Sequence, residues 1–319
     1  MTDLRAARSV RIDVPAFLQV AGVYLAIFVL LAFNLMFTPN FATVTNLRLQ
    51  LVQVAPVAIV AIGMALVIAT EGIDLSVGST MAVAAALLPL YLGYSVWVAV
   101  ALALTAGVLV GLVNGSLIAF AGMQPIIATL GLLVAGRGLA LVFADGRLTE
   151  LFDPTLDTLG NASVFGVPIS VLLVLVVTVA AGVAVYRTAF GRRLLATGGN
   201  RAAATLAGLP VKRTLVTVYV LSGLLAAVAG VLTTARQGAS DPSFVGLLIE
   251  LSAITAVVVG GTPLSGGRVR ILGTLMGALL MQLIIATVIQ QNLPDSTARM
   301  IQASIIVAAV YLQRGRRAP

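Results

Sequence analysis

The stretch LVIATEGIDLSVGSTMA, residues 66–82, places two carboxylates between apolar segments with almost no loop to separate them. Charge so close to hydrocarbon is costly, about 2.5–3.5 kcal/mol for an Asp at a helix centre on insertion scales. Glu71 and Asp74 should therefore face the interior of a helix bundle or a water-filled cavity. Gly72 permits unusual backbone geometry, and Asp74 or Ser76 can cap the helix that follows. We expect a broken helix here, in which Asp74 either caps and packs the break or lines a cavity.

The composition is that of a membrane protein. Hydrophobic residues make up 60% of the 319 residues and charged residues 9%, and the mean hydropathy is +1.11. A soluble globule of this length needs far more polar surface. The formal net charge of +8 does not indicate a nucleic-acid partner, because the basic residues lie in short loops between apolar segments rather than on one soluble surface.

The residue types that most enzymes use are missing. The chain contains no Cys and no His, which removes thiolate nucleophiles, disulfides, imidazole bases and the usual zinc ligands. Its only lysine, Lys212, is followed by Arg213, so no G-x-x-x-x-G-K-[ST] phosphate loop exists. We therefore expect neither an enzyme nor a metal site, and any ATP that the protein uses must be bound by another subunit.

About ten apolar segments are candidates to cross the membrane, at 1.5 Å per residue across roughly 30 Å of hydrocarbon. They are residues 16–37, 51–69, 75–92, 96–120, 125–143, 167–186, 214–234, 247–259, 271–289 and 298–312. The first is longer than the core of about 7–15 residues of a secretory signal, so we expect it to be retained. The predicted fold is an all-α, polytopic bundle that forms one transmembrane domain over residues 1–319.

The distribution of charge predicts the orientation of this bundle. With both termini in the cytoplasm, residues 187–213 form an inner loop and residues 144–166 an acidic outer loop. Inner loops and tails then hold 14 of the 19 basic residues: Arg5, Arg8, Arg11, Arg187, Arg192, Arg193, Arg201, Lys212, Arg213, Arg268, Arg270, Arg314, Arg316 and Arg317. Six acidic residues fall on the outer side, namely Asp145, Glu150, Asp153, Asp157, Asp241 and Asp295.

The inner loop contains a very short predicted helix over residues 202–207. Asn200 is its expected N-cap, Gly208 suits the left-handed position after it, and Pro210 blocks continuation. A helix this short is marginal in water and needs a partner, since isolated helices below about 12 residues are unstable. An apolar stripe follows the i, i+3, i+4 spacing and basic residues surround it. The stripe is Ala203, Leu206 and Ala207, and the basic residues are Arg192, Arg193, Arg201, Lys212 and Arg213. The alternative is an ordinary basic loop that only sets membrane orientation.

Small residues and a short repeat mark further contacts between helices. Gly107 and Gly111 form a G-x-x-x-G pair, and Ala226 and Gly230 an A-x-x-x-G pair, which predicts close helix packing. Residues 72–78 and 261–267 share the pattern G-x-x-L-S-x-G. A weak internal repeat is one interpretation of this match, and chance is the other.

Several polar side chains lie within or beside the predicted spans. Arg137 falls in the second half of segment 125–143 and needs partners there, either a carboxylate for assembly or a polar solute route. Asn114, Gln124 and Gln282 are neutral hydrogen-bonding groups that suit the hydroxyls of a polar solute in principle. Hydrogen bonds from helix to helix are the favoured interpretation of all three.

The motif G-I-D-L-S-V-G-S at residues 72–79 resembles the signature of the permease subunits of ribose-type ABC importers, a sugar branch of the binding-protein-dependent transport permeases. Three further blocks carry the likeness in order: G-M-Q-P-I-I-A-T-L-G-L-L-V-A-G-R-G (122–138), A-T-G-G-N-R-A-A-A-T-L-A-G (196–208) and A-V-V-V-G-G-T-P-L-S-G-G-R (256–268). The likeness covers most of the chain. It departs at Glu71, where members of the family often carry Gly.

The resemblance implies a set of partners. Residues 198–208 would be a coupling helix docked on a cytoplasmic ABC ATPase, which binds the ATP and Mg²⁺, so that this chain binds no cofactor. Two permease subunits, a homodimer or a heterodimer, would form the pathway in the bacterial inner membrane, among its lipids. A periplasmic or lipid-anchored binding protein would deliver a monosaccharide or related polyol.

The candidate site residues form two groups. The expected ATPase contact is Arg192, Arg193, Gly199, Asn200, Arg201, Ala203, Leu206, Ala207 and Gly208. The candidates for the substrate pathway or the broken helix are Glu71, Gly72, Asp74, Ser76, Asn114, Gln124 and Arg137. The competing hypothesis is an ion-coupled secondary transporter of a small polar solute, in which Glu71 and Asp74 are ion sites.

Overall fold

The structure, a computed structural model, describes residues 14–314, with side chains described from residue 22 onward except at 295, 306 and 308–314. Its helices are α1 (Val14–Phe37), α2 (Val44–Ala69), α3 (Val77–Tyr91), α4 (Val96–Ala119), α5 (Pro125–Phe143), α6 (Pro154–Asn161), α7 (Ile169–Arg187), α8 (Ala189–Gly199), α9 (Arg201–Leu206), α10 (Val211–Gln237), α11 (Ile249–Val259), α12 (Ile271–Gln290) and α13 (Asp295–Arg314). Its strands are β1 (Thr149–Glu150), β2 (Ser163–Val164), β3 (Val167–Pro168) and β4 (Ala239–Ser240). The basic residues expected in the inner tails lie outside the described residues, or, for Arg314, outside the described side chains.

The prediction of an all-α membrane protein is confirmed. Six of the described helices are long and apolar enough to cross a membrane, namely α2, α4, α5, α7, α10 and α12. Residues 22–37 of α1, together with α3 and α11, are shorter apolar helices. The 11 residues of α11 extend only about 16 Å, roughly half the hydrocarbon thickness. The expected tenth span corresponds to α13, which is not among these nine apolar helices.

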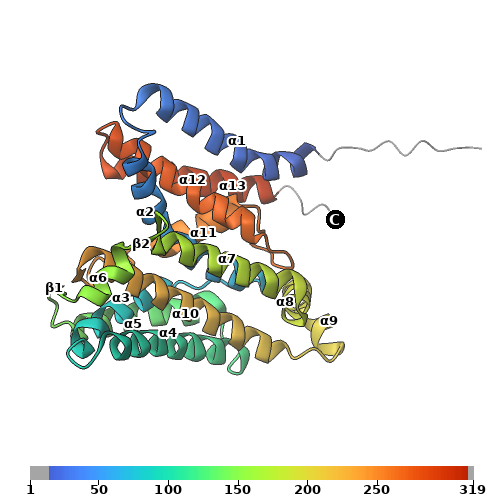
Figure 1. Cartoon of the computed structure of the whole chain (residues 1–319). Coiled ribbons are helices and arrows are strands. Elements are labelled where there is room, and N and C mark those ends of the chain that lie inside the picture. The colour runs from blue at the N-terminus through green and yellow to red at the C-terminus, as the bar shows by residue number, and fades with distance from the viewer. Residues whose placement is uncertain (1–13, 315–319) are drawn as a thin grey trace, which may run out of the picture.

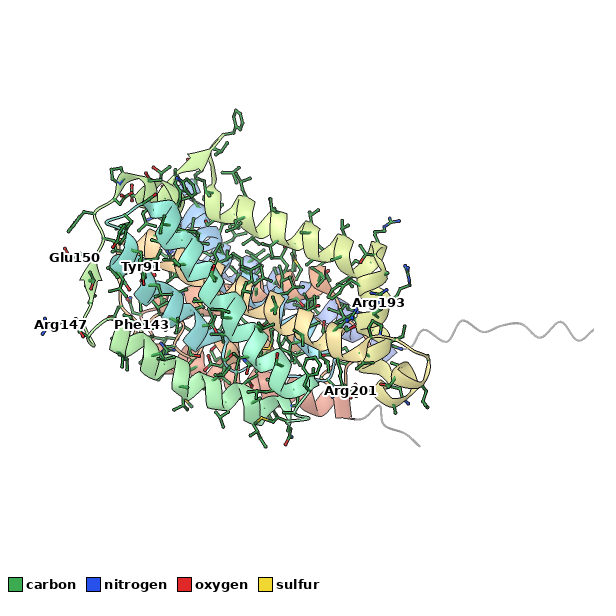
Figure 2. All side chains as sticks on the ribbon, turned by 90° about the horizontal axis from the view of Figure 1, so that it is seen from below. Tyr91, Phe143, Arg147, Glu150, Arg193 and Arg201 are labelled. Atoms are coloured by element: carbon green, nitrogen blue, oxygen red, sulfur yellow. The ribbon has the colours of Figure 1, made fainter. Side chains whose placement is uncertain are left out.

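Two opposite ends of the bundle are distinguished by what caps them (Figure 1). Helices α8 and α9 lie at one end, and β1, α6 and β2 lie at the other. Figure 2 shows the same separation in side chains: Arg193 and Arg201 project at one end, and Arg147 and Glu150 at the other.

The centre of the bundle is α10, which packs against α4, α2 and α3. A Cβ at Gly107 of α4 would lie 2.5 Å from the Cβ of Ala227 in α10, so the two backbones approach directly. Gly230, on another face of α10, would meet the carbonyl oxygen of Met81 in α3 at 2.6 Å. The small-residue pairs therefore pack helices closely, as predicted.

The start of α2 differs from the sequence expectation. The helix begins at Val44, seven residues before the predicted segment 51–69, so the connection between α1 and α2 is confined to residues 38–43. Thr43 is the reason, because its hydroxyl accepts a hydrogen bond from the Asn46 N–H at 3.4 Å and caps the helix. Polar residues in the first turns of α2 hid this start from a hydropathy pattern.

The segment 187–213, predicted as an inner loop, is mostly helical. The short helix expected at residues 202–207 is confirmed as α9, in which Asn200 Oδ1 accepts from the Ala203 N–H at 2.9 Å and Gly208 has φ +74°. Helix α8 was not predicted. It is capped by the Thr188 hydroxyl, which accepts from the Phe190 N–H, and anchored by Leu194, which is fully buried.

The predicted outer loop 144–166 is folded rather than irregular. Strand β1 pairs antiparallel with β4, so Thr149 lies opposite Ser240. Asp153 caps α6 by accepting from the N–H groups of Thr155 and Leu156, at 2.8 and 3.1 Å. One of the acidic residues expected to mark this loop thus has a structural role.

Candidate functional site

Asp74 holds the break between α2 and α3 together. Its side chain is 1% exposed. Oδ1 accepts from both the N–H and the hydroxyl of Ser76, at 3.0 and 2.7 Å, and Oδ2 accepts from the hydroxyl of Ser222 in α10 at 2.8 Å. The carboxylate therefore joins the broken helix to α10, the central helix of the bundle. This contact corresponds to the first of the two roles considered from the sequence, in which Asp74 caps and packs the break.

A buried polar chain extends this contact to a third helix. Asn114 of α4 is fully buried and donates from Nδ2 to the Ser76 hydroxyl at 2.8 Å. Ser76 thus accepts from Asn114 while it donates to Asp74, and its carbonyl accepts from the hydroxyls of Ser79 and Thr80. The chain Asn114–Ser76–Asp74–Ser222 links α4, the break and α10. Ser222 was missed from sequence because nothing distinguishes a small hydroxyl in an Ala-rich helix from a packing residue.

The expectations for Gly72 and for the cap of α3 need correction. Ser76 occupies the N-cap position of α3 but its side chain makes no cap hydrogen bond; its hydroxyl is held by Asp74 instead. Among the described residues the left-handed position in the break is Glu71, with φ +62°, and not Gly72. Gly72 is needed for space, because a Cβ there would lie 2.5 Å from the hydroxyl of the buried Tyr219.

The left-handed backbone at Glu71 gives a direct prediction. Glu71→Gly is expected to leave the free energy of unfolding unchanged or to raise it by up to about 1 kcal/mol, because an L side chain is strained in this conformation and glycine is not. Thermal unfolding of the purified protein measures this. Thr70→Gly at the preceding position, where φ is −98°, should be destabilising, because nothing there favours glycine and a buried hydroxyl that donates to the Val67 carbonyl is lost. Equal destabilisation by both changes would contradict the backbone explanation.

Three segments meet in backbone contact at the end of the bundle that carries α8 and α9. A Cβ at Gly198 of α8 would overlap the carbonyl oxygen of Ala69, the last residue of α2. The Gly267 N–H donates to the same oxygen at 3.0 Å, and a Cβ at Gly266 would lie 2.5 Å from Cγ of Glu71. We call residues 69–71, 198–199 and 266–267 the glycine junction. It brings together the end of α2, the end of α8 and the second copy of the G-x-x-L-S-x-G pattern.

Helix α9 extends from this junction and exposes an apolar stripe. Ala203 and Ala207 are exposed and Leu206 is 89% exposed, whereas Ala204 on the opposite side is buried. Arg201 Nη2 donates to the Thr70 carbonyl at 3.5 Å, so the first residue of α9 touches the break itself. Arg192, Arg193, Gly199, Asn200 and Gly208 are exposed beside it.

A groove of about 740 Å³ runs along α9. Its walls include residues 118–122 at the end of α4, Arg201 and Thr205 of α9, and Lys212 and Arg213 at the start of α10. The Lys212 ammonium lies 5.5 Å from the centre of the Phe120 ring, a cation–π contact that forms part of the wall. The groove is therefore basic, with an exposed apolar stripe at its side.

Arg137 holds a different part of the molecule. Its Nη1 donates to the carbonyl oxygens of Pro242 and Val245, at 2.7 and 2.8 Å. These oxygens belong to residues 241–248, between β4 and α11. Neither of the two sequence interpretations of Arg137 anticipated backbone carbonyls as its partners.

Glu250 in α11 is the residue most clearly missed by the sequence analysis. Its side chain is 7% exposed, and Oε2 has no hydrogen-bond partner among the described residues. A Cβ at Gly78 would lie 2.6 Å from that oxygen. The sequence feature that could have identified Glu250 is that it is the single carboxylate within the apolar segment 247–259.

The remaining polar candidates are not brought to one place. Gln124 is exposed at the N-cap of α5 and makes no side-chain cap bond. Gln282 donates to Gln50 and Gln53 of α2, at 2.9 and 2.8 Å, so it joins helices as favoured. Of the seven pathway candidates, the structure groups Asp74, Ser76 and Asn114, whereas Gln124 and Arg137 lie apart from them.

Comparison with known proteins identifies this arrangement. Residues 46–310 match the family described as branched-chain amino acid transport system / permease component. The chain belongs to this family of permeases. The resemblance found in the sequence motifs is thereby confirmed.

Curated sugar permeases are similar to this permease over most of its length. It is 41% identical over 263 residues to the ribose import permease protein of Escherichia coli, covering 81% of this chain and 82% of the relative. Identity is 38% over 266 residues to the galactofuranose transporter permease protein of Escherichia coli, covering 83% and 78%. Against the ribose import permease protein of Bacillus subtilis it is 36% over 312 residues, covering 97% of each chain. No solved structure matches the chain.

The family settles the class of the protein. As a permease component of an ABC transporter, the chain is a transport subunit of the inner membrane and not an enzyme, and separate subunits hydrolyse ATP. Such a system also implies an ATPase partner and a substrate-binding protein.

Proposed function

We propose that this permease imports a monosaccharide or related polyol, and that ATPase movement reaches its membrane helices through α9 and the glycine junction. The substrate class rests on its relatives, which are named for ribose, fructose, galactofuranose and L-arabinose. One observation carries the mechanism: the exposed basic segment α8–α9 touches the break between α2 and α3 directly, by backbone packing and through Arg201.

The proposed mechanism follows from these contacts. The ATPase subunit binds the stripe Ala203, Leu206 and Ala207 and the basic groove beside it, and ATP and Mg²⁺ are bound on that subunit. Because Gly198 packs on the Ala69 carbonyl without an intervening side chain, a shift of α8–α9 displaces the end of α2 directly. The buried chain from Asp74 to Ser222 and Asn114 carries that displacement to α10 and α4.

The proposed topology has ten membrane crossings with both termini in the cytoplasm. Six long apolar helices support six of these crossings. The shorter apolar helices, namely residues 22–37 of α1, α3 and α11, together with α13, are proposed for the other four, although α11 alone reaches only about half the hydrocarbon thickness. The end that carries α8 and α9 is rich in Arg and Lys, which supports a cytoplasmic position for it. A second permease subunit completes the pathway, and a sugar-binding protein outside the membrane docks at the end formed by β1, α6 and β2.

The ion-coupled alternative has no support. The similar proteins named above are import permeases. Asp74 is buried with both oxygens engaged by hydroxyl and amide donors, and Glu71 lies exposed against Gly266. The two carboxylates therefore do not form a joint ion site.

The stripe on α9 can be tested at one residue. Leu206→Asp should leave the permease folded and inserted, since the side chain is 89% exposed. It should lower both ATPase co-purification and sugar uptake at least about tenfold, because the variant buries an unpaired charge in the contact with the ATPase. Uptake into vesicles and pull-down of the ATPase measure the effect. Phe152→Asp, 87% exposed at the opposite end, is the matched control for ATPase co-purification, which it should leave unchanged. Its uptake is not compared, because that end is the proposed docking site of the binding protein. Unchanged co-purification and uptake in Leu206→Asp would show that α9 is not the contact.

A further inference from the structure

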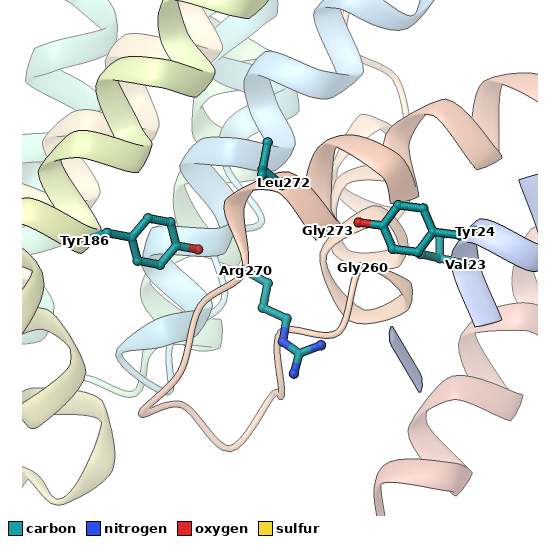
Figure 3. A pocket seen from close by; sticks show the side chains of 7 residues that line it. All are labelled: Val23, Tyr24, Tyr186, Gly260, Arg270, Leu272 and Gly273. Atoms are coloured by element: carbon teal, nitrogen blue, oxygen red, sulfur yellow. The ribbon is translucent and has the colours of Figure 1, made fainter. Parts of the chain in front are cut away.

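A second pocket lies on the surface of the bundle, separate from the groove along α9. It has a volume of about 290 Å³ and is lined by residues of α1, α7, the end of α11 and the start of α12: Val23, Tyr24, Tyr186, Gly260, Arg270, Leu272 and Gly273. Figure 3 shows the hydroxyls of Tyr24 and Tyr186 directed toward the pocket from opposite sides, with Arg270 between them. The proposed transport mechanism does not use it.

The pocket holds a positive charge that no described carboxylate balances. Among the described side chains, none in the lining is acidic. Within the residues that the structure describes, the Arg270 guanidinium makes no hydrogen bond or ion pair, and it lies exposed over Gly261. Arg187 and Arg268, which flank Tyr186 and Arg270 in sequence, are exposed as well. A bound anion would supply the missing partner for the guanidinium.

The turn that carries Arg270 is held in place. The Tyr186 hydroxyl donates to the Val269 carbonyl at 3.2 Å and accepts from the Ile271 N–H at 3.1 Å. The Arg270 N–H donates to the Thr262 hydroxyl at 3.0 Å. The backbone on both sides of Arg270 is thus fixed, so the guanidinium is presented from a defined position rather than from a free loop.

The surroundings of the pocket are those of a membrane interface. Leu272 is 63% exposed and Tyr24 is 48% exposed, and in a membrane protein such apolar and aromatic surface faces lipid. Arg270 lies at the first turn of a membrane-length helix, at the end of the bundle that carries the basic segment α8–α9. Basic pockets between transmembrane helices at this level bind the headgroups of anionic lipids.

We propose that this pocket binds the phosphate of an anionic phospholipid in the inner leaflet. Arg270 pairs with the phosphate, the Tyr24 hydroxyl donates to one of its oxygens, and Leu272 and Val23 contact the start of the acyl chains. The pocket lies between α1, α7 and the turn that connects α11 to α12, and this turn contains residues 266–267 of the glycine junction. The bound lipid therefore holds the peripheral helix α1 against that turn.

The test uses the full-length permease in nanodiscs that contain phosphatidylcholine with or without phosphatidylglycerol, followed by native mass spectrometry of the lipids retained after release. The wild type should retain phosphatidylglycerol in preference to phosphatidylcholine. Arg270→Gln should reduce that retention by about fivefold, the effect of one basic residue near an anionic surface. Arg193→Gln is the matched control, an exposed Arg on α8 outside the pocket, and should retain the wild-type amount.

Any of the following outcomes would overturn the proposal or the assignment of the ligand as a lipid. Equal retention by the two Arg variants would overturn the site, as would equal retention of the two lipids by the wild type. Thermal protection of the permease by inorganic phosphate alone, at the level seen with phosphatidylglycerol, would show a free-anion site and overturn the lipid assignment. If Arg270→Gln is not recovered folded, Tyr24→Phe decides, since it removes only the hydroxyl: a loss of retention of roughly twofold is expected, and no change contradicts the proposal.

Discussion

Asp74→Leu is expected to lower the free energy of unfolding of the permease by about 3–5 kcal/mol and to abolish import. The change removes the acceptor of three hydrogen bonds and leaves the Ser76 N–H and the hydroxyl protons of Ser76 and Ser222 without an acceptor in a buried site. Unsatisfied buried groups cost about 1–3 kcal/mol each. The yield of folded protein and its thermal unfolding in detergent measure the loss.

Three further variants separate the structural role of Asp74 from a role in the pathway. Ser222→Ala removes one donor and should cost about 1 kcal/mol. Asp153→Leu removes a carboxylate that also caps a helix, but at the surface of the end opposite α8 and α9, and should cost about 1 kcal/mol. Asp74→Asn keeps the shape and can reverse its bond with Ser222, so it should fold and import. A folded Asp74→Asn permease that imports no sugar would contradict the structural role and place this residue in the pathway.

Gly198→Ala is expected to abolish coupled import. The added Cβ would overlap the Ala69 carbonyl oxygen, and it would also lie 2.8 Å from the Gly267 nitrogen. Both obstacles are backbone atoms, so no rotamer change relieves them and α8 must move away from α2. We expect sugar uptake to fall at least about tenfold. The sugar-loaded binding protein should also no longer stimulate ATP hydrolysis by the assembled importer.

Gly182→Ala in α7 is the matched control outside the glycine junction and the expected ATPase contact. No atom lies within 4 Å of a Cβ at Gly182, and alanine favours a helix over glycine by about 1 kcal/mol. This variant should be at least as stable as the wild type and import normally. Normal import by Gly198→Ala would mean that the glycine junction does not transmit the movement; loss of import by both variants would mean that the defect does not come from the contact between α8 and α2.

The features that were predicted correctly from sequence are those encoded by neighbouring residues. Asn200, Gly208 and Pro210 predicted the ends of α9, because a cap depends on side chains within about three positions of the helix end. Membrane-length helices such as α5, whose bounds match the prediction, follow from the composition of a single segment. Helix α8 was missed because its glycines argue against a helix locally, and its stability comes from the burial of Leu194.

The candidate site also has features that were predicted from the sequence and contacts that were not. The importance of residues 69–78 was evident from charge next to hydrocarbon, but the partner of Asp74 was not, since Ser222 is 148 positions away. The partners of Arg137 are more than 100 positions distant and are carbonyl oxygens, which every residue carries. No local pattern distinguishes such an acceptor from any other.

The sequence by itself determined that this protein is a helical membrane permease without a G-x-x-x-x-G-K-[ST] phosphate loop, and that a short capped helix lies in its largest polar loop. These properties depend on composition, on adjacent residues and on motifs in order along the chain. Only the tertiary structure decided that Asp74 joins the broken helix to α10 by a hydrogen bond, and that Gly198 lets α8 pack against the Ala69 carbonyl. The physical reason is that such contacts depend on which backbones approach one another in space, and that approach is set by the packing of the whole bundle.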